Sequence, residues 1–232
     1  MNLRFHLHFV ASLVITTTCS LAQEKSVRPG INDSFVDPNA KDYVERFEIE
    51  SREVFSKRSE IAKACELTEG LTVADIGAGT GIFTRIFAKE VGSKGTVIAV
   101  DIAQNFLDHI TVTGRELGQT NIQTILCTAD STKLPPNSID VAYICDTYHH
   151  FEFPIKTMQS LHAALKPNGR LILIDFKRIE GQTSDRTMKH VRAGQEVFES
   201  EIVAAGFKKV KEHSGILEEN YFVEFEKTET LK

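Results

Sequence analysis

One stretch of this chain, residues 72–81, constrains its fold more than any other. It reads Thr-Val-Ala-Asp-Ile-Gly-Ala-Gly-Thr-Gly, a short apolar run followed by glycine at every second position. The run predicts a buried parallel strand, the glycines predict a sharp turn, and a helical pattern opens at Ile82. Because glycine has no Cβ, a ligand can lie against the backbone of such a turn. Asp75 interrupts the apolar run, where an unpaired carboxylate is costly to bury, so we expect a polar partner there.

A second strand and an acidic residue follow at a spacing that suits a ribose. Gly95 leads into Thr-Val-Ile-Ala-Val at 96–100, and Asp101 ends the run. A carboxylate about 20 residues after the glycines can accept hydrogen bonds from both hydroxyls of a ribose diol. The dinucleotide-binding motif G-x-G-x-x-G would need a glycine at position 82, and this chain has Ile82 there.

Residues 75–81 resemble the first motif of the class I S-adenosylmethionine-dependent methyltransferases: an acidic residue, an apolar residue and G-x-G-x-G, matched at every fixed position. The resemblance covers about residues 70–227. It implies an α/β fold, a Rossmann-like, doubly wound sheet of seven strands that is mostly parallel, with one antiparallel strand from a C-terminal hairpin. We expect that hairpin at 207–212 and 221–226, after a helix at 185–205. The cofactor implied is S-adenosyl-L-methionine.

The resemblance also assigns the cofactor-binding residues. In that family the end of the third strand commonly supplies an acid for the adenine amino group, and Asp130 takes this position after the expected strand at 122–127. Read without the resemblance, Asp130 would cap a turn. The predicted cofactor-binding residues are Asp75, Gly77, Ala78, Gly79, Gly81, Asp101, Ile102, Asp130, Ser131 and Asp146.

The loop after the expected fourth strand, at 139–145, should face the transferred methyl group. It reads Asp-Thr-Tyr-His-His-Phe at 146–151, which differs from the Asn-Pro-Pro-Tyr of many DNA and protein-glutamine N-methyltransferases and is similar to loops of small-molecule methyltransferases. His149 and His150 are the candidate catalytic residues, because an imidazole with an ordinary pKa near 6.5 can remove a proton near neutrality. Each could instead be structural. We expect no metal, since Asp146 and both histidines share one short loop and no fourth ligand is evident.

The N-terminus differs in composition from the rest of the chain. Residues 1–22 contain one arginine, no acid and an apolar core at 9–15 followed by small residues, which predicts a secretory signal peptide, or an anchor if it stays uncleaved. We therefore expect an exported protein, periplasmic or secreted, without stable membrane insertion after cleavage. Residues 23–39 are predicted to form a loose linker. Residues 40–232 are predicted to be one methyltransferase domain, with a long helix within 40–69 before the core at 70–227.

Charge and cysteine content argue against two further features. The net charge of −5 becomes −6 without Arg4, and lysine and arginine are not clustered, so a nucleic-acid substrate is not expected. Beyond the signal, Cys65, Cys127 and Cys145 are an odd number at irregular spacing, which does not predict a disulfide framework. In the strand order of the resembled fold, two strands separate the last two cysteines, about 14 Å, which is too far to bridge.

Three functions stay open. The leading one is methyl transfer to a small-molecule acceptor by in-line displacement. The second is a dinucleotide-binding oxidoreductase, which Ile82 and the C-terminal hairpin disfavour. The third is a catalytically inactive cofactor-binding partner protein. The intact glycine loop and the two acids expected to bind ribose and adenine, Asp101 and Asp130, argue against it. The sequence specifies neither the acceptor nor the oligomeric state.

Overall fold

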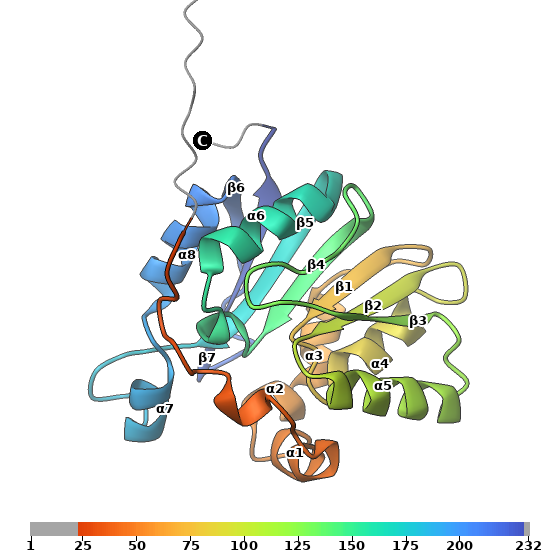
Figure 1. Cartoon of the computed structure of the whole chain (residues 1–232), viewed down its shortest axis with the longest axis horizontal. Helices are drawn as coiled ribbons and strands as arrows, with labels where there is room; N and C mark the ends of the chain where they lie inside the picture. Colours follow the sequence, from red (N-terminus) through yellow and green to blue (C-terminus); the bar gives the residue numbers. More distant parts are fainter. Residues whose placement is uncertain (1–22, 230–232) are drawn as a thin grey trace, which may run out of the picture.

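Seven strands form one sheet in the order β3-β2-β1-β4-β5-β7-β6 (Figure 1). The computed structural model describes residues 23–229, and the predicted signal segment at 1–22 lies outside them. The strands are β1 (Thr72–Ile76), β2 (Thr96–Asp101), β3 (Ile122–Leu126), β4 (Ile139–Cys145), β5 (Leu165–Phe176), β6 (Phe207–Glu212) and β7 (Asn220–Lys227). Within residues 23–229, no helix has both the length and the apolar composition needed to cross a membrane.

The strands from β3 to β5 are parallel, and β7 runs against both of its neighbours. Asp75 in the centre of the sheet lies opposite Ala99 of β2 and Tyr143 of β4. β7 pairs antiparallel with β5 and with β6. The central strands are continuous apolar runs because both faces of the sheet are covered. The predicted mostly parallel α/β sheet, with one antiparallel strand from a C-terminal hairpin, is confirmed.

Helices cover both faces of the sheet, and each face has its own apolar core (Figure 1). One face carries α3 (Arg58–Ala64), α4 (Ile82–Glu90) and α5 (Gln104–Glu116), and the other carries α6 (Pro154–Ala164) and α8 (Gln195–Ala204). Val73 packs into the first core and Ala74 into the second, because successive strand residues point to opposite faces. The carboxyl ends of the parallel strands lie beyond both layers, which leaves their loops free to form a site.

The N-terminal helical region is three short helices, so the prediction of a single long helix is wrong. They are α1 (Ala40–Phe47), α2 (Glu53–Ser56) and α3. The break at 48–52 lets Arg52 reach Asp146, and it lets Glu53 accept hydrogen bonds from the backbone N–H groups of residues 218–220. A continuous helix over 40–64 would be about 37 Å long and would carry these side chains away from their partners.

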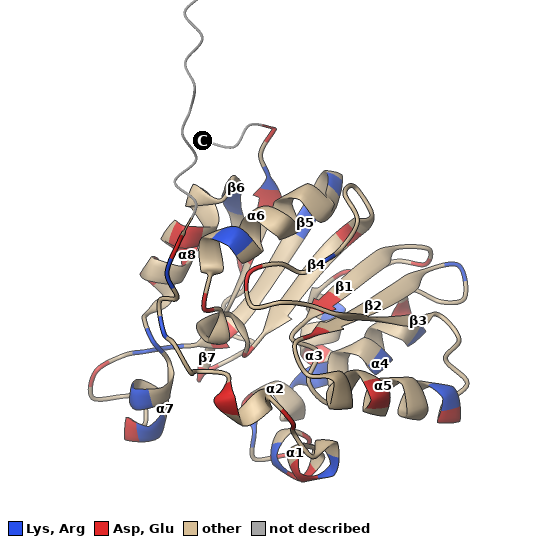
Figure 2. Ribbon diagram, in the orientation of Figure 1, with Lys and Arg blue, Asp and Glu red and all other residues tan. Residues whose placement is uncertain are grey.

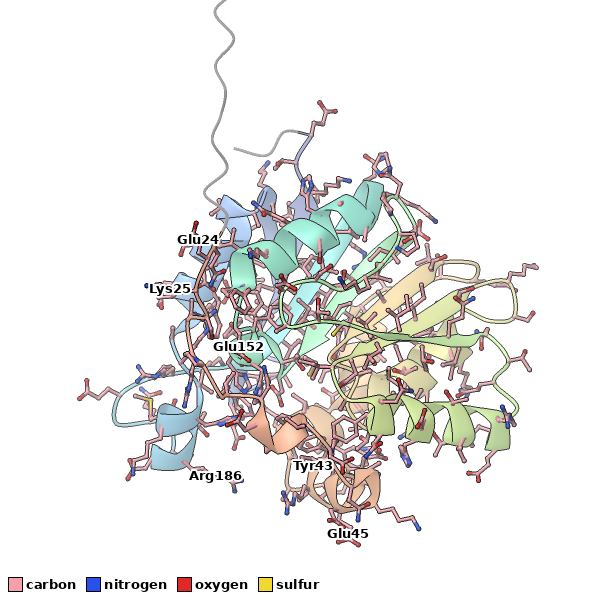
Figure 3. The ribbon with its side chains drawn as sticks, viewed as in Figure 1. Glu24, Lys25, Tyr43, Glu45, Glu152 and Arg186 are labelled. Atoms are coloured by element: carbon pink, nitrogen blue, oxygen red, sulfur yellow. The ribbon has the colours of Figure 1, made fainter. Side chains whose placement is uncertain are left out.

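Residues 23–39, expected to be a loose linker, are bound along the domain. Glu152 accepts the Val27 N–H at its carbonyl (2.9 Å) and the Ser26 hydroxyl at its carboxylate (2.8 Å). Asn32, which precedes the short helix η1 (Asp33–Phe35), donates to the His150 carbonyl in the helix η2 (Tyr148–His150). Figure 3 labels Glu24 and Lys25 on this segment above Glu152. The segment thereby brings η1 to the same end of the domain as α1.

The predicted helix at 185–205 is also divided, into α7 (Asp185–His190) and α8. Residues 191–194 turn the chain between them: Val191 is buried, Arg192 forms a bidentate ion pair with Glu201, and Gly194 precedes α8. The turn is needed because α8 packs on the sheet, whereas α7 lies with α1 and α2 at the end of the domain (Figure 1).

Charges and cysteines are distributed as the sequence suggests. Figure 2 shows lysine and arginine interspersed with aspartate and glutamate along the described chain. Cys65, Cys127 and Cys145 are free thiols. Cys127 directly follows β3 and Cys145 ends β4, and β2 and β1 lie between these two strands.

Candidate functional site

The loops at the carboxyl ends of the parallel strands surround a cleft of about 850 Å³, in the size range of small-molecule sites. Tyr43 of α1 and Arg186 of α7 lie at its rim, from different elements (Figure 3). The structure brings these sequence-predicted residues together as lining of the one cleft: Asp75, Gly77, Ala78, Gly79, Asp101, Ile102, Ser131, Asp146, His149 and His150.

The glycine loop between β1 and α4 needs each of its glycines, for different reasons. Gly77, Gly79 and Gly81 all have positive φ, between 54° and 81°. A Cβ on Gly77 would lie 2.1 Å from Thr147 Cγ2, and one on Gly81 would lie 2.6 Å from Ile110 Cγ1. The same position on Gly79 meets only ordinary contacts, the nearest at 3.7 Å. Gly79 therefore presents bare backbone to the cleft, whereas Gly81 begins α4 and is required by packing.

Asp101, at the end of β2, is tied directly to the glycine loop. Its Oδ2 accepts the Gly79 N–H (2.8 Å) and its Oδ1 accepts the Ala103 N–H (2.9 Å). Burial raises the pKa of Asp101, and these two backbone hydrogen bonds oppose the rise. Each carboxylate oxygen has a further lone pair. Asp101 can therefore hold the loop and still accept from hydroxyl groups of a ligand.

The polar partner that we expected for Asp75 is Thr84 of α4. The Thr84 hydroxyl donates to Asp75 Oδ2 at 2.6 Å. Burial raises the pKa of Asp75 to about 6, the Thr84 hydrogen bond opposes this, and the nearby Asp101 adds to it. The two acids thus crowd one side of the cleft, which favours a ligand with hydrogen-bond donors or positive charge there.

The end of β3 contributes Cys127, Ala129 and Ser131 to the cleft, but not Asp130. The Asp130 carboxylate accepts the Thr128 hydroxyl (2.9 Å) and lies 4.0 Å from Lys156 Nζ. Thr128 and Ser131 pair across a tight turn, so Asp130 occupies the turn position that its local sequence suggests. Its adenine-binding role stays a prediction.

Asp146 is held by two residues that the sequence did not single out. Arg52 Nη2 lies 2.6 Å from its Oδ2, and the Asn220 amide donates to its Oδ1 at 2.6 Å. Burial raises the pKa of Asp146, and Arg52 opposes the rise. Arg46, Arg52 and Arg58 recur every six residues, and nothing in that spacing distinguishes the arginine that turns inward.

His149 is fixed by a buried carboxylate. Its Nδ1 lies 2.8 Å from Asp175 Oδ1, and its backbone N–H donates to Asp175 Oδ2 (3.1 Å). Both side chains are almost fully buried, and Asp175 is part of β5. The sequence did carry a signal for Asp175: like Asp75, it is a lone acid in an apolar strand, close to the strand's carboxyl end.

A third histidine, His190 at the end of α7, joins the predicted pair. Its ring centroid lies 4.9 Å from that of His149 and 5.0 Å from that of His150. His150 Nδ1 is buried and has no hydrogen-bond partner among the described residues. Burial, with His149 and His190 nearby, lowers the pKa of His150 to about 2, so this ring is neutral near neutral pH. His190 is 40 residues away in the sequence, and no local spacing could have linked it to the pair.

Aromatic side chains form the outer wall of the cleft. Tyr43 contacts Phe106 edge-on at 5.2 Å between centroids, and Phe35 contacts His150 in the same way at 5.2 Å. The end of α1 is fixed to the glycine loop by Arg85, which pairs with Glu48 (2.8 Å) and donates to the Thr80 carbonyl (2.6 Å). This wall can exclude water from a bound ligand.

Comparison with known proteins gives the same domain type. Residues 74–173 match the family model described as "Methyltransferase domain". The ubiquinone/menaquinone biosynthesis C-methyltransferase UbiE of Escherichia fergusonii is 30% identical over 110 residues, which cover 47% of this chain and 44% of the relative. The chain thus matches less than half the length of this curated relative.

Solved structures share the fold at low identity. A S-adenosylmethionine-dependent methyltransferase from Aquifex aeolicus superposes with a TM-score of 0.71 at 22% identity, covering 83% of this chain and 100% of that one. The [4+2]-cyclase SpnF superposes with a TM-score of 0.62 at 15% identity, covering 83% and 97%. These neighbours support the architecture.

The prediction that the protein is exported, or anchored in a membrane, is wrong. The relatives of the UbiE type are cytoplasmic. The signal prediction relied on residues 1–22, which lie outside the described residues and carry no support for it. An apolar stretch followed by small residues is too general a pattern to establish a signal peptide by itself.

Fold, motif and domain match agree. The glycine loop lies between a central parallel strand and α4, the second strand ends in an acid bonded to that loop, and β7 closes the sheet in antiparallel fashion. The matched domain begins within β1 and ends within β5, so it includes the glycine loop and the Asp146–Phe151 loop. Residues 74–173 thus form a methyltransferase domain, and the sheet order, the glycine loop and the acid at the end of β2 are similar to those of the class I S-adenosylmethionine-dependent methyltransferases.

Proposed function

We propose that the protein transfers a methyl group from S-adenosylmethionine to a small-molecule acceptor. The observation that carries this proposal is the hydrogen bond from the Gly79 N–H to Asp101. It joins the glycine loop to the acid predicted to bind ribose, and both line one cleft. The same cleft continues to the loop at 146–151, where a second small molecule would meet the cofactor. The cleft volume suits two small ligands.

The residues that would hold the cofactor are taken from those predicted from the sequence, and two further residues support them. We propose that Asp101 binds the ribose hydroxyls of S-adenosylmethionine and that Ile102 and Ser131 contact its adenine. The positively charged methionine end would lie on the side of the cleft that carries Asp75. Gly79 would allow close approach of the backbone. We add Arg52 and Asn220 as residues that position Asp146.

When bound, S-adenosylmethionine would supply an electrophilic methyl group; the acceptor atom would form the new bond to carbon, and the C–S electron pair would stay on sulfur. The leaving group is neutral, so the protein can act mainly by alignment, for which effective molarity contributes up to roughly 7–11 kcal/mol. The aromatic wall and α1 would exclude water from the acceptor. A proton on the acceptor must leave, and His149 and His150 are the predicted proton acceptors. His149 is the stronger candidate, because burial lowers the pKa of His150 to about 2 and makes its ring a weak base.

The acceptor class follows from the lining of the cleft beyond Asp146. Phe35, Phe151 and Phe176 lie there with the histidines, so we propose a small and mainly apolar acceptor with one polar group. The name of the UbiE relative, a C-methyltransferase of quinone biosynthesis, is compatible with such an acceptor. The acidic net charge favours this class over nucleic acid.

The experiment has a binding part and a turnover part. Calorimetry on the full chain should give saturable, stoichiometric binding of S-adenosylmethionine or S-adenosylhomocysteine and none of NAD. Incubation with labelled S-adenosylmethionine and a panel of phenols, thiols, amines and quinols should then give a labelled product. Binding of NAD instead would support the oxidoreductase. Cofactor binding without label transfer to any acceptor class would contradict the proposal and support a non-catalytic role, or a different reaction such as the one for which SpnF is named.

A further inference from the structure

Three histidine rings converge at the acceptor side of the cleft. His149 and His150 come from η2, and His190 comes from α7, which packs against them. One ring nitrogen of each residue lies within 4.8 Å of the nitrogens of the other two. Three imidazoles bound tetrahedrally to a first-row metal ion at about 2.0–2.1 Å have their nitrogens about 3.3–3.4 Å apart, so His150 and His190 would have to move by up to about 1.5 Å toward the ion.

The hydrogen bonds around His149 suit a metal ligand. Asp175 occupies its Nδ1, which leaves Nε2 as the nitrogen that can face an ion. Metal-binding histidines usually donate their other ring N–H to a carboxylate or carbonyl, which fixes the ring and strengthens the ligand. Asp175 is fully buried and also accepts the backbone N–H groups of His149 and Phe176, so this orientation is rigid.

His150 provides a second, independent observation. Its Nδ1 is buried without a hydrogen-bond partner among the described residues, while a backbone hydrogen bond with Ile31 acts on the same ring; burying an unpaired ring nitrogen costs free energy. Each such buried, unpaired group in a folded protein calls for an explanation. A metal ion that binds the nitrogen would be one.

The backbone around His190 is anchored as well. Arg28, from the N-terminal segment, donates to the carbonyls of Lys189 and His190 and so fastens the end of α7 beside η2. His190 is exposed, His150 is half-buried and His149 is buried, so the three ligands lead from the core to the open cleft. A fourth coordination position would face that cleft.

We propose that His149, His150 and His190 form a site for one divalent first-row transition ion, with zinc as the ion that suits three imidazoles and one open position best. This replaces the expectation of no metal, which considered only ligands within one loop. Imidazole ligands favour zinc, iron, copper and nickel over magnesium and calcium. With the open position toward the cleft, the ion would bind the polar group of the acceptor and lower its pKa. The ion would then replace the histidines as the group that promotes loss of the acceptor's proton, because both ring nitrogens of His149 would be occupied. That role rests on the proposed function, whereas metal binding itself does not.

The test uses the untagged full chain, because a histidine tag would bind the same ions. After dialysis against a chelator, calorimetric titration with zinc chloride should give one site per chain. Cobalt(II) should give a visible ligand-field spectrum of a low-symmetry site. His190→Ala removes an exposed ligand, so the fold should survive, and it should weaken zinc binding at least tenfold and abolish the cobalt spectrum. Asp175→Asn should weaken zinc binding about 10–100-fold, the usual effect of losing an outer-shell partner.

His109→Ala is the matched control, since His109 is a half-buried histidine of α5 outside the cluster, and it should bind zinc as the unchanged chain does. The proposal is overturned if the unchanged chain binds no stoichiometric zinc, or if His190→Ala binds it as tightly. S-adenosylhomocysteine binding is measured on the same samples. Intact cofactor binding without zinc would refute the metal site alone, and zinc binding without cofactor binding would refute the proposed function alone.

Discussion

Replacing Asp101 by asparagine tests the nucleoside assignment most directly. Asp101 is 5% exposed, so water screens its interactions little. Hydrogen bonds to a charged group contribute about 1.5–3 kcal/mol each, and asparagine keeps the shape and one acceptor but loses the charge. We expect a loss of about 2–3 kcal/mol in cofactor binding, or about 30- to 150-fold in the dissociation constant, measured by calorimetry with S-adenosylhomocysteine.

The same substitution also acts on stability. Whichever way the amide is oriented, its NH2 group faces the backbone N–H of either Gly79 or Ala103, and that N–H then has no acceptor. We therefore expect the free energy of unfolding to fall by about 1–3 kcal/mol. Binding must accordingly be measured at a temperature where circular dichroism shows the variant folded.

Asp140→Asn provides the matched control. Asp140, near the start of β4 and thus at the opposite end of the sheet, accepts the Thr72 N–H (2.9 Å) and pairs with Lys166 (2.8 Å). Its substitution should lower stability without changing cofactor affinity. A folded Asp101→Asn protein with an unchanged dissociation constant, or equal weakening in both variants, would refute the ribose assignment.

Three further predictions concern stability and are measured by chemical denaturation. Gly81→Ala should lower the free energy of unfolding by about 1–3 kcal/mol more than Gly118→Ala, because both have positive φ but a Cβ clashes only at the first; equal losses would contradict this. The raised pKa of Asp75, about 6 when folded, means that the folded state holds the extra proton, so stability falls by about 2–3 kcal/mol as pH rises from 4 to 7. Asp75→Asn should remove that part of the slope, and an unchanged slope would refute it. Arg52→Met should cost about 2–3 kcal/mol, since it leaves a buried carboxylate short of a partner. Lys57→Met, which breaks an exposed pair of similar length, should leave the free energy of unfolding nearly unchanged.

The fold and one half of the cleft could be predicted because their signals are local. The strand, the glycines and the start of α4 are contiguous, and Asp101 follows at a spacing set by one helix and one strand. Backbone conformation decides these features: positive φ at Gly77, Gly79 and Gly81 is a property of a few adjacent residues. The strand order then follows from how such units connect in a doubly wound sheet.

The other half of the cleft depends on packing between distant segments. Periodicity predicted one helix over the N-terminal region and one over 185–205, but ion pairs and burial of Val191 outweigh local helix preference at both breaks. Those breaks are what turn Arg52 toward Asp146 and His190 toward the loop histidines.

The sequence by itself determined the sheet, the glycine loop and the positions of Asp75 and Asp101 beside that loop, because chain connectivity and backbone geometry specify them. Tertiary structure alone decided which arginine becomes a buried partner, which carboxylate orients His149, and that a third histidine lies beside the pair. These contacts join residues 26 to 94 positions apart, as for Asp175 with His149 and Arg52 with Asp146. No sequence periodicity encodes such distances, since only the packing of α1, α2 and α7 over the carboxyl ends of the strands brings these residues together.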